Sequence, residues 1–373
     1  MAVATEPKVA IVHDWLTNLG GAERVVVTMK KAFPQADIYT SVYQPGSVPG
    51  LSGPVQTSFL QNWPLAKRKH QLYPTLRPLA FESFDFSDYD IVITSASAEA
   101  KGIITPTETL HVSYIHTPAR YYWSHYDEYL RSPGFGALNP LIRLLLPRFV
   151  GTRRKWDYAA AQRADIVLAN SQEVQKRIKK YYKRDSIVLN PPVDESRFKV
   201  DKSESGDYFL VVSRLIPYKR VDLAVRACTE LGEQLIVVGT GPELKSLQKM
   251  AGPTVKFVGA LDDVATTKYY LGCKAFIFTA EEDFGITPVE AMAAGKPVIS
   301  LGRAGAAETV VNGKTGVYFE KQTVLAVVGA IQAFTEMTFS SEHIKKHAEN
   351  YSEDKFISRL QDIINSALNE KKK

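Results

Sequence analysis

Nearly continuous apolar runs, rich in β-branched residues, recur along the chain and alternate with segments of helical spacing. Runs without polar–apolar alternation are typical of parallel strands that are buried on both faces. Segments 22–33, 221–230 and 242–250 have helical spacing, and each lies between two such runs. This order of elements predicts doubly wound parallel α/β sheets. The expected strands are 8–14, 37–42, 90–95, 111–116, 165–170, 186–189, 207–214, 234–239, 255–259, 275–280, 297–301 and 316–319.

The length of the chain, 373 residues, predicts two domains. A single hydrophobic core stops growing at about 250–300 residues. Pro191 and Pro192 directly follow an expected strand and cannot continue it, which indicates a boundary there. We therefore expect an N-terminal domain over 1–192 and a C-terminal domain over 193–351. Segment 353–368 is amphipathic and can pack on either half; we assign 352–373 to the N-terminal domain.

Two features follow strands of the first half, at the positions where open α/β sheets bind ligands. Gly20 and Gly21 permit close backbone approach at the start of a helix, whose free N–H groups favour an anion. They indicate either a phosphate- or sugar-facing loop or a plain turn, and they lack the GxGxxG spacing of a dinucleotide site. His116 ends its strand and precedes an aromatic cluster, so it either lines a cleft or caps the strand end.

Cations and a glycine turn follow strands of the second half. Arg214 and Lys219 share one loop after strand 207–214, and Arg220 follows them. A guanidinium fork and an ammonium suit a diphosphate, although surface charge is the plainer interpretation. Gly239 begins a turn that leads into a helix and is consistent with backbone approaching a ligand.

Two carboxylates flank the turn after strand 275–280. Glu282 lies at the end of a buried strand, where a carboxylate is costly without a polar partner. Thr287, Pro288 and Glu290 have the pattern of a capping box, with Thr287 as the N-cap. Glu290 is therefore either a capping residue or a ligand-binding one. The segment from Asp283 to Ile286 holds a glycine and would direct backbone N–H groups towards a bound ligand.

The spacing of these residues resembles that of a known family. Glu282 and Glu290 are separated by seven residues, and EDFGITPVEA resembles the E-x7-E motif of retaining glycosyltransferases of family 4. The resemblance extends over essentially the whole chain, through the Gly20-Gly21 loop, IHTP, the Arg214–Lys219 pair, VVGTGP and Tyr351-Ser352. HDWLTNLGGAERV, YDIVITSASAEAKG and SYIHTPARYYW are most similar to mannosyltransferases and related enzymes of bacterial surface-polysaccharide synthesis.

This resemblance implies the GT-B fold, with two facing Rossmann-like domains and a central cleft. It implies that Arg214 and Lys219 hold the donor diphosphate and that Glu282 faces the donor sugar. His116 would contact that sugar from the opposite domain, so these four residues are the expected catalytic set. Glu290 would bind the ribose. The remaining expected donor-binding residues are Gly20, Gly21, Gly239, Phe284, Gly285, Ile286 and Thr287.

The implied reaction is transfer of a hexose with retention, through front-face displacement. The branch suggests GDP-mannose as the donor and a lipid-linked saccharide or polysaccharide as the acceptor. A glucosyl-, galactosyl- or N-acetylhexosaminyl-transferase that uses a UDP-sugar is the alternative, followed by a nucleotide-sugar epimerase and a non-catalytic sugar-binding protein. The resemblance implies no cofactor and no metal, and Asp262-Asp263 does not match a D-x-D motif.

The charge is unevenly distributed along the chain. The net charge is +6, but residues 1–193 carry 23 basic and 16 acidic residues, a balance of +7, which leaves −1 for 194–373. A basic half indicates nucleic acid, an anionic membrane or a phosphorylated ligand, unless it is only solvated surface. With a lipid-linked acceptor implied, we favour a membrane-facing or diphosphate-facing surface over nucleic acid.

Two segments of the basic half suit a membrane surface. Lys67-Arg68-Lys69 lies among aromatic and apolar residues, and the stretch from Leu138 to Trp156 mixes leucines with arginines. The alternative for the second segment is a buried helix or loop under the sheet. No leader or spanning segment is expected. Cys228 and Cys273 have no metal-site spacing and fit a reducing compartment. The expected location is the cytoplasm, with or without contact to the inner face of the cytoplasmic membrane.

Overall fold

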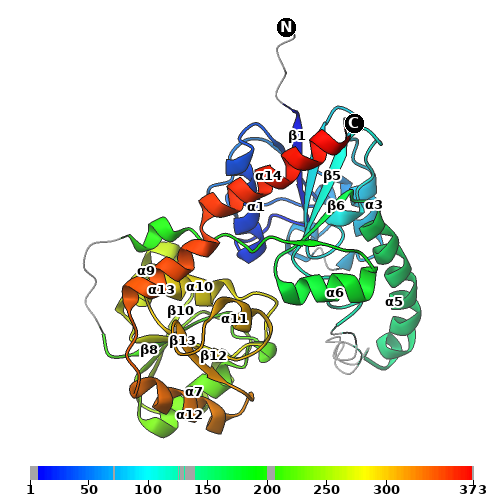
Figure 1. The fold of residues 1–373 in the computed structure, drawn as a ribbon. Helices are drawn as coiled ribbons and strands as arrows, with labels where there is room; N and C mark the ends of the chain where they lie inside the picture. The colour runs from blue at the N-terminus through cyan, green and yellow to red at the C-terminus, as the bar shows by residue number, and fades with distance from the viewer. Residues whose placement is uncertain are drawn as a thin grey trace. The chain divides into compact units, whose positions relative to one another are not determined.

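The computed structural model describes residues 7–69, 72–124, 126, 130, 139–199 and 206–371, apart from the side chains of Ile142 and Leu145. The chain divides into two units. The N-terminal unit is Met1–Asn190 with Phe356–Lys373, and the C-terminal unit is Pro191–Lys355. Each unit contains one parallel sheet with helices on both faces (Figure 1), so the predicted doubly wound α/β architecture is confirmed.

The N-terminal unit has a seven-stranded sheet in the order β3-β2-β1-β4-β5-β6-β7, and all its strand pairs are parallel. Sequence patterning missed one of these strands, because β3 has three residues, none of them fully buried. The strands are β1 Val9–His13, β2 Asp37–Thr40, β3 Val55–Thr57, β4 Ile91–Ala96, β5 Leu110–Ile115, β6 Ile166–Ala169 and β7 Ile187–Val188.

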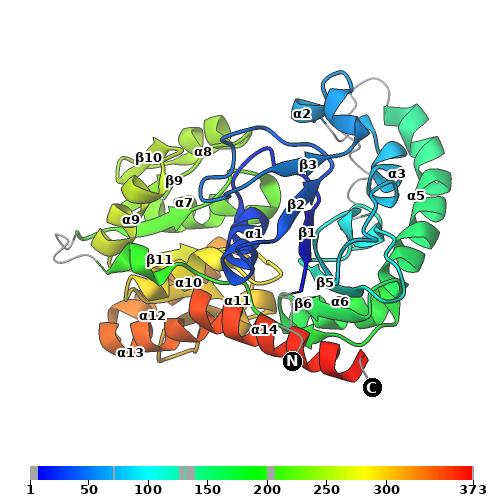
Figure 2. The same ribbon diagram turned by 90° about the horizontal axis from the view of Figure 1, so that it is seen from above.

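Alternate residues of β1 separate the two cores of the N-terminal unit. Val9 and Ile11 pack with helices α1 and α14, whereas Ala10 and Val12 pack with residues of α3 and the following loop. Figure 2 shows α1 on one side of this sheet and α3 and α5 on the other. The helices are α1 Gly21–Ala32, α2 Ala66–Lys69, α3 Leu76–Glu82, α5 Asn139–Gln162, α6 Gln172–Tyr182 and α14 Glu353–Lys371, with short helices η1 Phe59–Asn62 and η3 Ala100–Gly102.

The last helix, α14, packs on the N-terminal unit. Phe356, Leu360, Ile363 and Ile364 belong to the same buried cluster as the apolar residues of α1. The side-chain amide of Gln361 also donates a hydrogen bond to the carbonyl of α1 residue Ala32, at 3.0 Å. The apolar face that the sequence predicts for this helix thus covers the N-terminal sheet, a choice that the pattern alone left open.

The C-terminal unit has a six-stranded sheet in the order β10-β9-β8-β11-β12-β13, also parallel throughout. Its two faces again alternate along the strands, since Leu210 and Phe276 pack in one cluster and Val211 and Ile277 in the other. The strands are β8 Phe209–Val212, β9 Leu235–Val238, β10 Val255–Gly259, β11 Ala275–Phe278, β12 Val298–Leu301 and β13 Gly316–Phe319.

Helices cover both faces of the second sheet. Residues of α7, α8 and α12 fill one cluster, and residues of α9, α10, α11 and α13 fill the other. No helix among the described residues is long and apolar enough to cross a membrane. The helices are α7 Val221–Leu231, α8 Leu244–Met250, α9 Asp263–Gly272, α10 Ile286–Ala293, α11 Ala304–Thr309, α12 Val324–Thr335 and α13 Ser341–Ala348, with short helices η5 Glu195–Phe198, η6 Pro217–Lys219 and η7 Glu349–Tyr351.

Candidate active site

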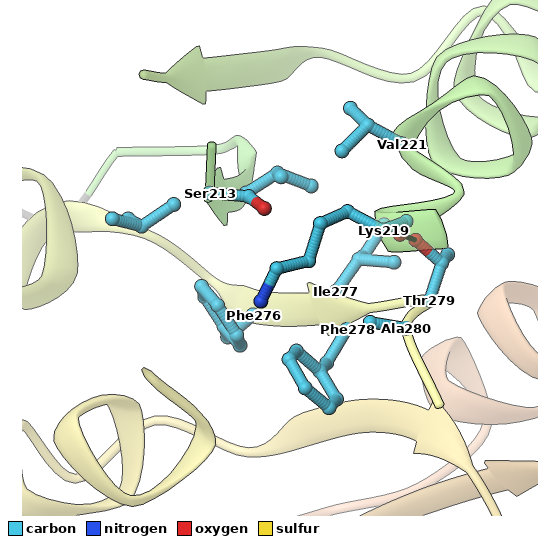
Figure 3. Close-up of a pocket in the computed structure, with 10 residues that line it drawn as sticks. Ser213, Lys219, Val221, Phe276, Ile277, Phe278, Thr279 and Ala280 are labelled. Carbon is cyan, nitrogen blue, oxygen red and sulfur yellow. Dashed lines mark hydrogen bonds between the residues drawn. The ribbon is translucent and has the colours of Figure 1, made fainter. Parts of the chain in front are cut away.

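A lysine and a glutamate form an ion pair at the carboxyl edge of the C-terminal sheet. Lys219 ends η6 after β8, and Glu282 follows the neighbouring strand β11. The Lys219 ammonium contacts Oε1 of Glu282, and the two side chains are 15% and 18% exposed. Glu282 therefore has the polar partner that a carboxylate at a buried strand end requires. In Figure 3 the lysine side chain extends across β11, in a small pocket between β8 and β11.

The backbone that carries this lysine is tied to the neighbouring strand. Thr279 donates a hydrogen bond from Oγ1 to the carbonyl oxygen of Lys219, at 3.0 Å. Gln322 in turn donates from Nε2 to the carbonyl oxygen of Thr279, at 2.9 Å. These contacts hold the lysine-bearing loop against the strand that leads to Glu282. Neither Thr279 nor Gln322 was singled out from the sequence.

The two arginines of the same loop differ in their surroundings. Arg214 is exposed, and its guanidinium lies 3.5 Å from the hydroxyl of Tyr218. Arg220 instead pairs with Asp222 through two contacts, of 3.0 and 3.2 Å. A guanidinium that already binds a carboxylate bidentately has fewer donors left for a ligand. Arg214 is therefore the more exposed of the two guanidinium groups, and Arg220 is the one held by a carboxylate.

The predicted capping box at Glu290 is wrong. Helix α10 begins at Ile286, and its N-cap is Gly285, whose φ is +86°. Glycine adopts this left-handed conformation readily, so the helix starts before Thr287, which does not cap it. Pro288 is accommodated within the first turn, where backbone N–H groups have no helical acceptor.

Glu290 binds side chains instead of the helix terminus. Its Oε1 lies 2.9 Å from Nη1 of Arg197, and its Oε2 accepts a hydrogen bond from the hydroxyl of Tyr270 at 3.0 Å. Burial raises the pKa of Tyr270, and the adjacent Glu290 raises it further, which keeps the phenol protonated as a donor. Arg197 and Tyr270 therefore orient the carboxylate. Neither residue was singled out from the sequence; they come from η5 and α9.

Close backbone packing sets the position of the turn between Glu282 and α10. The N–H of Gly305, in the first turn of α11, donates to the carbonyl oxygen of Glu282 at 2.9 Å. A Cβ at Gly305 would lie 2.3 Å from Cα of Phe284, so only glycine fits there. Gly305 was not singled out from the sequence, although a glycine shortly after strand 297–301, at the start of a helix, was an available signal.

His116 lies buried at the carboxyl edge of the N-terminal sheet. Its Nε2 is 2.8 Å from Oγ of Ser95, which lies one residue before the end of β4. Burial, together with the nearby His13, lowers the pKa of His116 to about 3. The imidazole is therefore neutral at physiological pH, and it serves as a hydrogen-bonding group rather than as a cation.

A second histidine pairs with an acidic residue of α1. Nδ1 of His13 lies 2.9 Å from the carbonyl oxygen of Ser95, and its Nε2 lies 3.6 Å from Oε1 of Glu23. Burial lowers the pKa of His13, but hydrogen bonding and charge from Glu23 outweigh burial, so the pKa is raised overall. None of the three residues His13, Ser95 and Glu23 was singled out from the sequence.

The glycine loop and a buried aspartate complete this edge. Gly20 is the N-cap of α1, and a Cβ on it would lie 2.8 Å from Oε2 of Glu23. Gly21 is the first residue of that helix. Asp14 accepts hydrogen bonds of 2.6–2.9 Å from the N–H groups of Ser97, Ala98 and Ala100. It too was not singled out from the sequence. The carboxylate thus fixes the loop after β4.

The expected site residues fall into two groups. His116, Gly20 and Gly21 lie in the N-terminal unit. Their expected approach to the other group across a cleft stays a prediction. The C-terminal group consists of Arg214, Lys219, Gly239, Glu282, Phe284, Gly285, Ile286, Thr287 and Glu290.

Buried histidines predict a loss of stability in acid. Burial lowers the pKa of His111 to about 4 and that of His116 to about 3. Below pH 6.5 the unfolded chain binds protons at these rings that the folded protein does not. The free energy of unfolding should then fall by ~1.4 kcal/mol per pH unit for each ring. His13 acts oppositely: its contribution is present below pH 6.5 and is lost as pH rises through its raised pKa.

Urea unfolding at pH 6.5 and 4.5 tests this linkage. Carboxylates titrate in the same pH range. The test therefore compares how much the free energy of unfolding changes between the two pH values in the wild type and in His111→Gln. We expect the wild type to lose ~2–3 kcal/mol more than the variant over this interval, because only its unfolded state gains the His111 proton. Equal losses in the two proteins would contradict the neutral, buried state of His111.

Both halves of the chain match models of glycosyltransferase families. Residues 19–197 match Glycosyltransferase Family 4, and residues 192–351 match Glycosyl transferases group 1. The GDP-mannose-dependent alpha-(1-6)-phosphatidylinositol monomannoside mannosyltransferase of Mycolicibacterium smegmatis is 30% identical over 199 residues, 45% of this chain and 52% of the relative. The alpha-1,3/1,6-mannosyltransferase ALG2 of Dictyostelium discoideum is 29% identical over 45% of this chain and 46% of its own length. The matched segments thus span about half of these relatives.

Solved structures resemble the whole chain. Anabaena HepE, in complex with UDP and glucose, superimposes with a TM-score of 0.70 at 19% identity, over 97% of this chain and all of its own. Sucrose-phosphate synthase from Thermosynechococcus elongatus gives 0.72 at 14% identity, over 98% of this chain and all of its own. These likenesses show the predicted GT-B fold. The chain belongs to the glycosyltransferases, with a Family 4 domain in its N-terminal half and a group 1 domain in its C-terminal half.

Proposed function

We propose that the protein transfers a hexose from a nucleotide sugar to a saccharide acceptor, with retention at the anomeric carbon. The observation that carries this proposal is the Lys219–Glu282 pair at the carboxyl edge of the C-terminal sheet, beside the start of α10. A cation for a diphosphate and a carboxylate for sugar hydroxyls are in contact there. Open parallel sheets bind their ligands at this edge.

The proposed reaction is a front-face displacement. The acceptor hydroxyl forms a bond to the anomeric carbon on the face from which the nucleoside diphosphate departs. The bond from that carbon to the diphosphate oxygen breaks, and the leaving diphosphate accepts the proton of the hydroxyl. We propose that Arg214 and Lys219, with no metal ion or other cofactor, stabilise the charge on this leaving group. Such preorganised donors are often the largest catalytic contribution.

GDP-mannose is the donor that we propose. Its support is the similarity to the Mycolicibacterium enzyme, a GDP-mannose-dependent mannosyltransferase. A UDP-sugar is the second candidate, because HepE superimposes over nearly the whole chain and binds UDP and glucose. In either case Glu290, held by Arg197 and Tyr270, is proposed to accept hydrogen bonds from the ribose. We propose a lipid-linked saccharide or polysaccharide as the acceptor.

Thermal unfolding with a panel of nucleotides tests the donor proposal. A ligand that binds only the folded state at 100 times its Kd adds about 2.7 kcal/mol of stability. We expect GDP and GDP-mannose to raise the Tm by several degrees and ADP to leave it unchanged. A shift with UDP and UDP-glucose instead would replace GDP-mannose by the second candidate. No shift with any nucleotide would contradict a donor site.

Product analysis without acceptor separates a transferase from its rivals. A transferase is expected to hydrolyse the bound donor slowly to the free sugar and the nucleoside diphosphate. An epimerase would return an epimeric sugar, and a binding protein would return the donor unchanged. Either of the last two results, obtained with a donor that raises the Tm, would overturn the transfer proposal.

We propose that the N-terminal unit also contacts an anionic membrane. Leu65, Leu141 and Leu144 are 60%, 53% and 74% exposed. Lys67-Arg68-Lys69 lies in α2, beside the first of these leucines. The alternative of a wholly buried segment does not hold for α5, although its Val150 is buried. Leu138, which begins the expected amphipathic stretch, lies outside the described residues.

Co-sedimentation with vesicles tests the membrane proposal. We expect binding to phosphatidylglycerol vesicles at low salt and its loss at high salt, since each cation contributes about 1 kcal/mol near an anionic surface. Leu144→Glu should weaken binding, whereas Leu325→Glu, at a residue that is 79% exposed in the C-terminal unit, should not. Absence of binding by the wild type at low salt would contradict the proposal.

A further inference from the structure

Three buried side chains connect the glycine loop to His116. Glu23 in α1 lies 3.6 Å from Nε2 of His13, at the end of β1. Nδ1 of His13 lies 3.1 Å from Oγ of Ser95, and that oxygen lies 2.8 Å from Nε2 of His116. The side chains come from α1, β1, β4 and the end of β5, and each residue is less than 9% exposed. All four residues belong to the N-terminal unit, in which Figure 2 labels α1, β1 and β5.

The carbonyl oxygen of Ser95 determines where the first proton lies. A carbonyl oxygen only accepts hydrogen bonds, so Nδ1 of His13, 2.9 Å from it, carries a hydrogen. Nε2 of His13 faces the Glu23 carboxylate, which favours a second hydrogen on that nitrogen. The raised pKa of His13 agrees with a ring that is protonated on both nitrogens.

The hydroxyl of Ser95 determines which ring nitrogen of His116 carries a hydrogen. A hydroxyl has one hydrogen to donate and can accept in return. The single hydrogen on Nδ1 of His13 is shared between the carbonyl oxygen and Oγ of Ser95, at 2.9 and 3.1 Å. Oγ therefore accepts from His13, and its own hydrogen is left to be donated to Nε2 of His116, at 2.8 Å. An imidazole nitrogen that accepts a hydrogen bond carries no hydrogen, so the neutral ring of His116 holds its hydrogen on Nδ1.

We propose that Glu23, His13 and Ser95 are positioning residues that hold His116 as the Nδ1–H tautomer, so that its ring donates a hydrogen bond to an oxygen of the bound nucleotide sugar. The substrate part of this inference rests on the proposed function. The series of contacts also places the positive charge on His13, beside Glu23, rather than on His116. A second charge on His116 would face that of His13, in rings whose centroids are 6.3 Å apart.

The glycine of the N-terminal loop supports this arrangement independently. A side chain at Gly20 would place Cβ 2.8 Å from Oε2 of Glu23. Glycine at this N-cap therefore leaves room for the Glu23 carboxylate to reach His13. The sequence suggested Gly20 as a phosphate-facing residue. In the structure its lack of a side chain also leaves space for Glu23, the first residue of this series of contacts.

Nitrogen-15 NMR of histidine-labelled protein measures the tautomer directly, because two-bond couplings separate Nδ1–H from Nε2–H rings. For the wild type at pH 7 we expect His116 as Nδ1–H and His13 protonated on both nitrogens. Ser95→Ala should release His116 to the other tautomer or to a mixture. Ser95→Thr, which keeps the hydroxyl, should retain the wild-type signal. An Nε2–H ring in the wild type, or an unchanged tautomer in Ser95→Ala, would overturn the inference.

Turnover of the donor supplies the second measurement. Ser95→Ala should lower kcat by about tenfold to a hundredfold, as for loss of a group that orients a functional histidine, and Ser95→Thr should restore it. Ser113→Ala is the matched control: it removes another buried hydroxyl of the same sheet, which bonds Thr94 at 2.9 Å. We expect it to change neither tautomer nor turnover. If Ser95→Ala switches the tautomer but leaves kcat unchanged, the proposed contact with the sugar nucleotide is overturned.

The two measurements also separate this inference from the proposed function. The tautomer of His116 is read without substrate, so it is established or refuted even if the protein transfers no sugar. If the donor panel and hydrolysis fail while the NMR result holds, the proposed function is at fault. If donor turnover is normal and the His116 ring of the wild type is Nε2–H, the proposed positioning role of Glu23, His13 and Ser95 is wrong.

Discussion

Replacing Lys219 by alanine is expected to lower turnover at saturating donor by roughly 10²–10³-fold, the range found when one preorganised charge-stabilising donor is removed. The ammonium lies in contact with Glu282 on a loop that Thr279 holds against β11. Its position is thus fixed before the donor binds. The effect should appear mainly in kcat, because negative charge builds up on the leaving diphosphate only as the sugar bond breaks.

The test is a comparison of kcat and Tm for three variants. Lys245→Ala removes an exposed lysine from α8 in the same unit and should leave both unchanged. Lys219→Arg keeps the charge and should retain more activity than Lys219→Ala. Lys219→Ala also leaves Glu282 without its cation, so a modest fall in Tm is expected alongside the loss of turnover. Near-normal kcat in Lys219→Ala would refute a role in leaving-group stabilisation.

Replacing Gly239 by alanine should lower the free energy of unfolding by about 3 kcal/mol or more. Its φ is +135°, which L side chains rarely adopt, and an added Cβ would lie 1.8 Å from the carbonyl oxygen of Ser213. That backbone cannot yield freely, because Gly239 N–H bonds Gly259 at 2.7 Å and Ser213 N–H bonds Val238 at 3.0 Å. Overpacking and left-handed strain each cost about 1–3 kcal/mol.

Urea denaturation measures this cost, with Gly329→Ala as the control. Gly329 lies within α12, and a Cβ there would meet no atom within 4 Å. Alanine favours a helix interior by up to ~1 kcal/mol over glycine, so the control should be neutral or slightly stabilised. Gly239→Ala should also weaken donor binding, because Ser213 begins the loop with Arg214 and Lys219. A free energy of unfolding for Gly239→Ala within ~0.5 kcal/mol of the wild-type value would show that the loop accommodates the new side chain without strain.

Particular elements show why the sheets were predictable and some details were not. Strands such as β4 and β11 are buried along their whole length, so their composition alone identified them. Strand β3 has an exposed central residue and three residues in all, too few to form a pattern. The start of α10 was misplaced because a threonine, a proline and a glutamate imitate a capping box. The helix starts before Thr287 because Gly285 adopts a left-handed conformation as its N-cap. Glu290 does not cap the helix because it pairs with Arg197, which is far from it in the sequence.

The sequence by itself determined two parallel α/β sheets, the boundary region near Pro191 and a family resemblance based on motifs at strand ends. These depend on local apolar patterns and on residues near one another in the chain, such as Glu282 and Glu290. The tertiary structure alone decided which polar groups meet. Ser95 lies 82 residues from His13, and Arg197 lies 93 from Glu290. Such pairings depend on strand order and helix packing, which bring together residues that no local pattern connects.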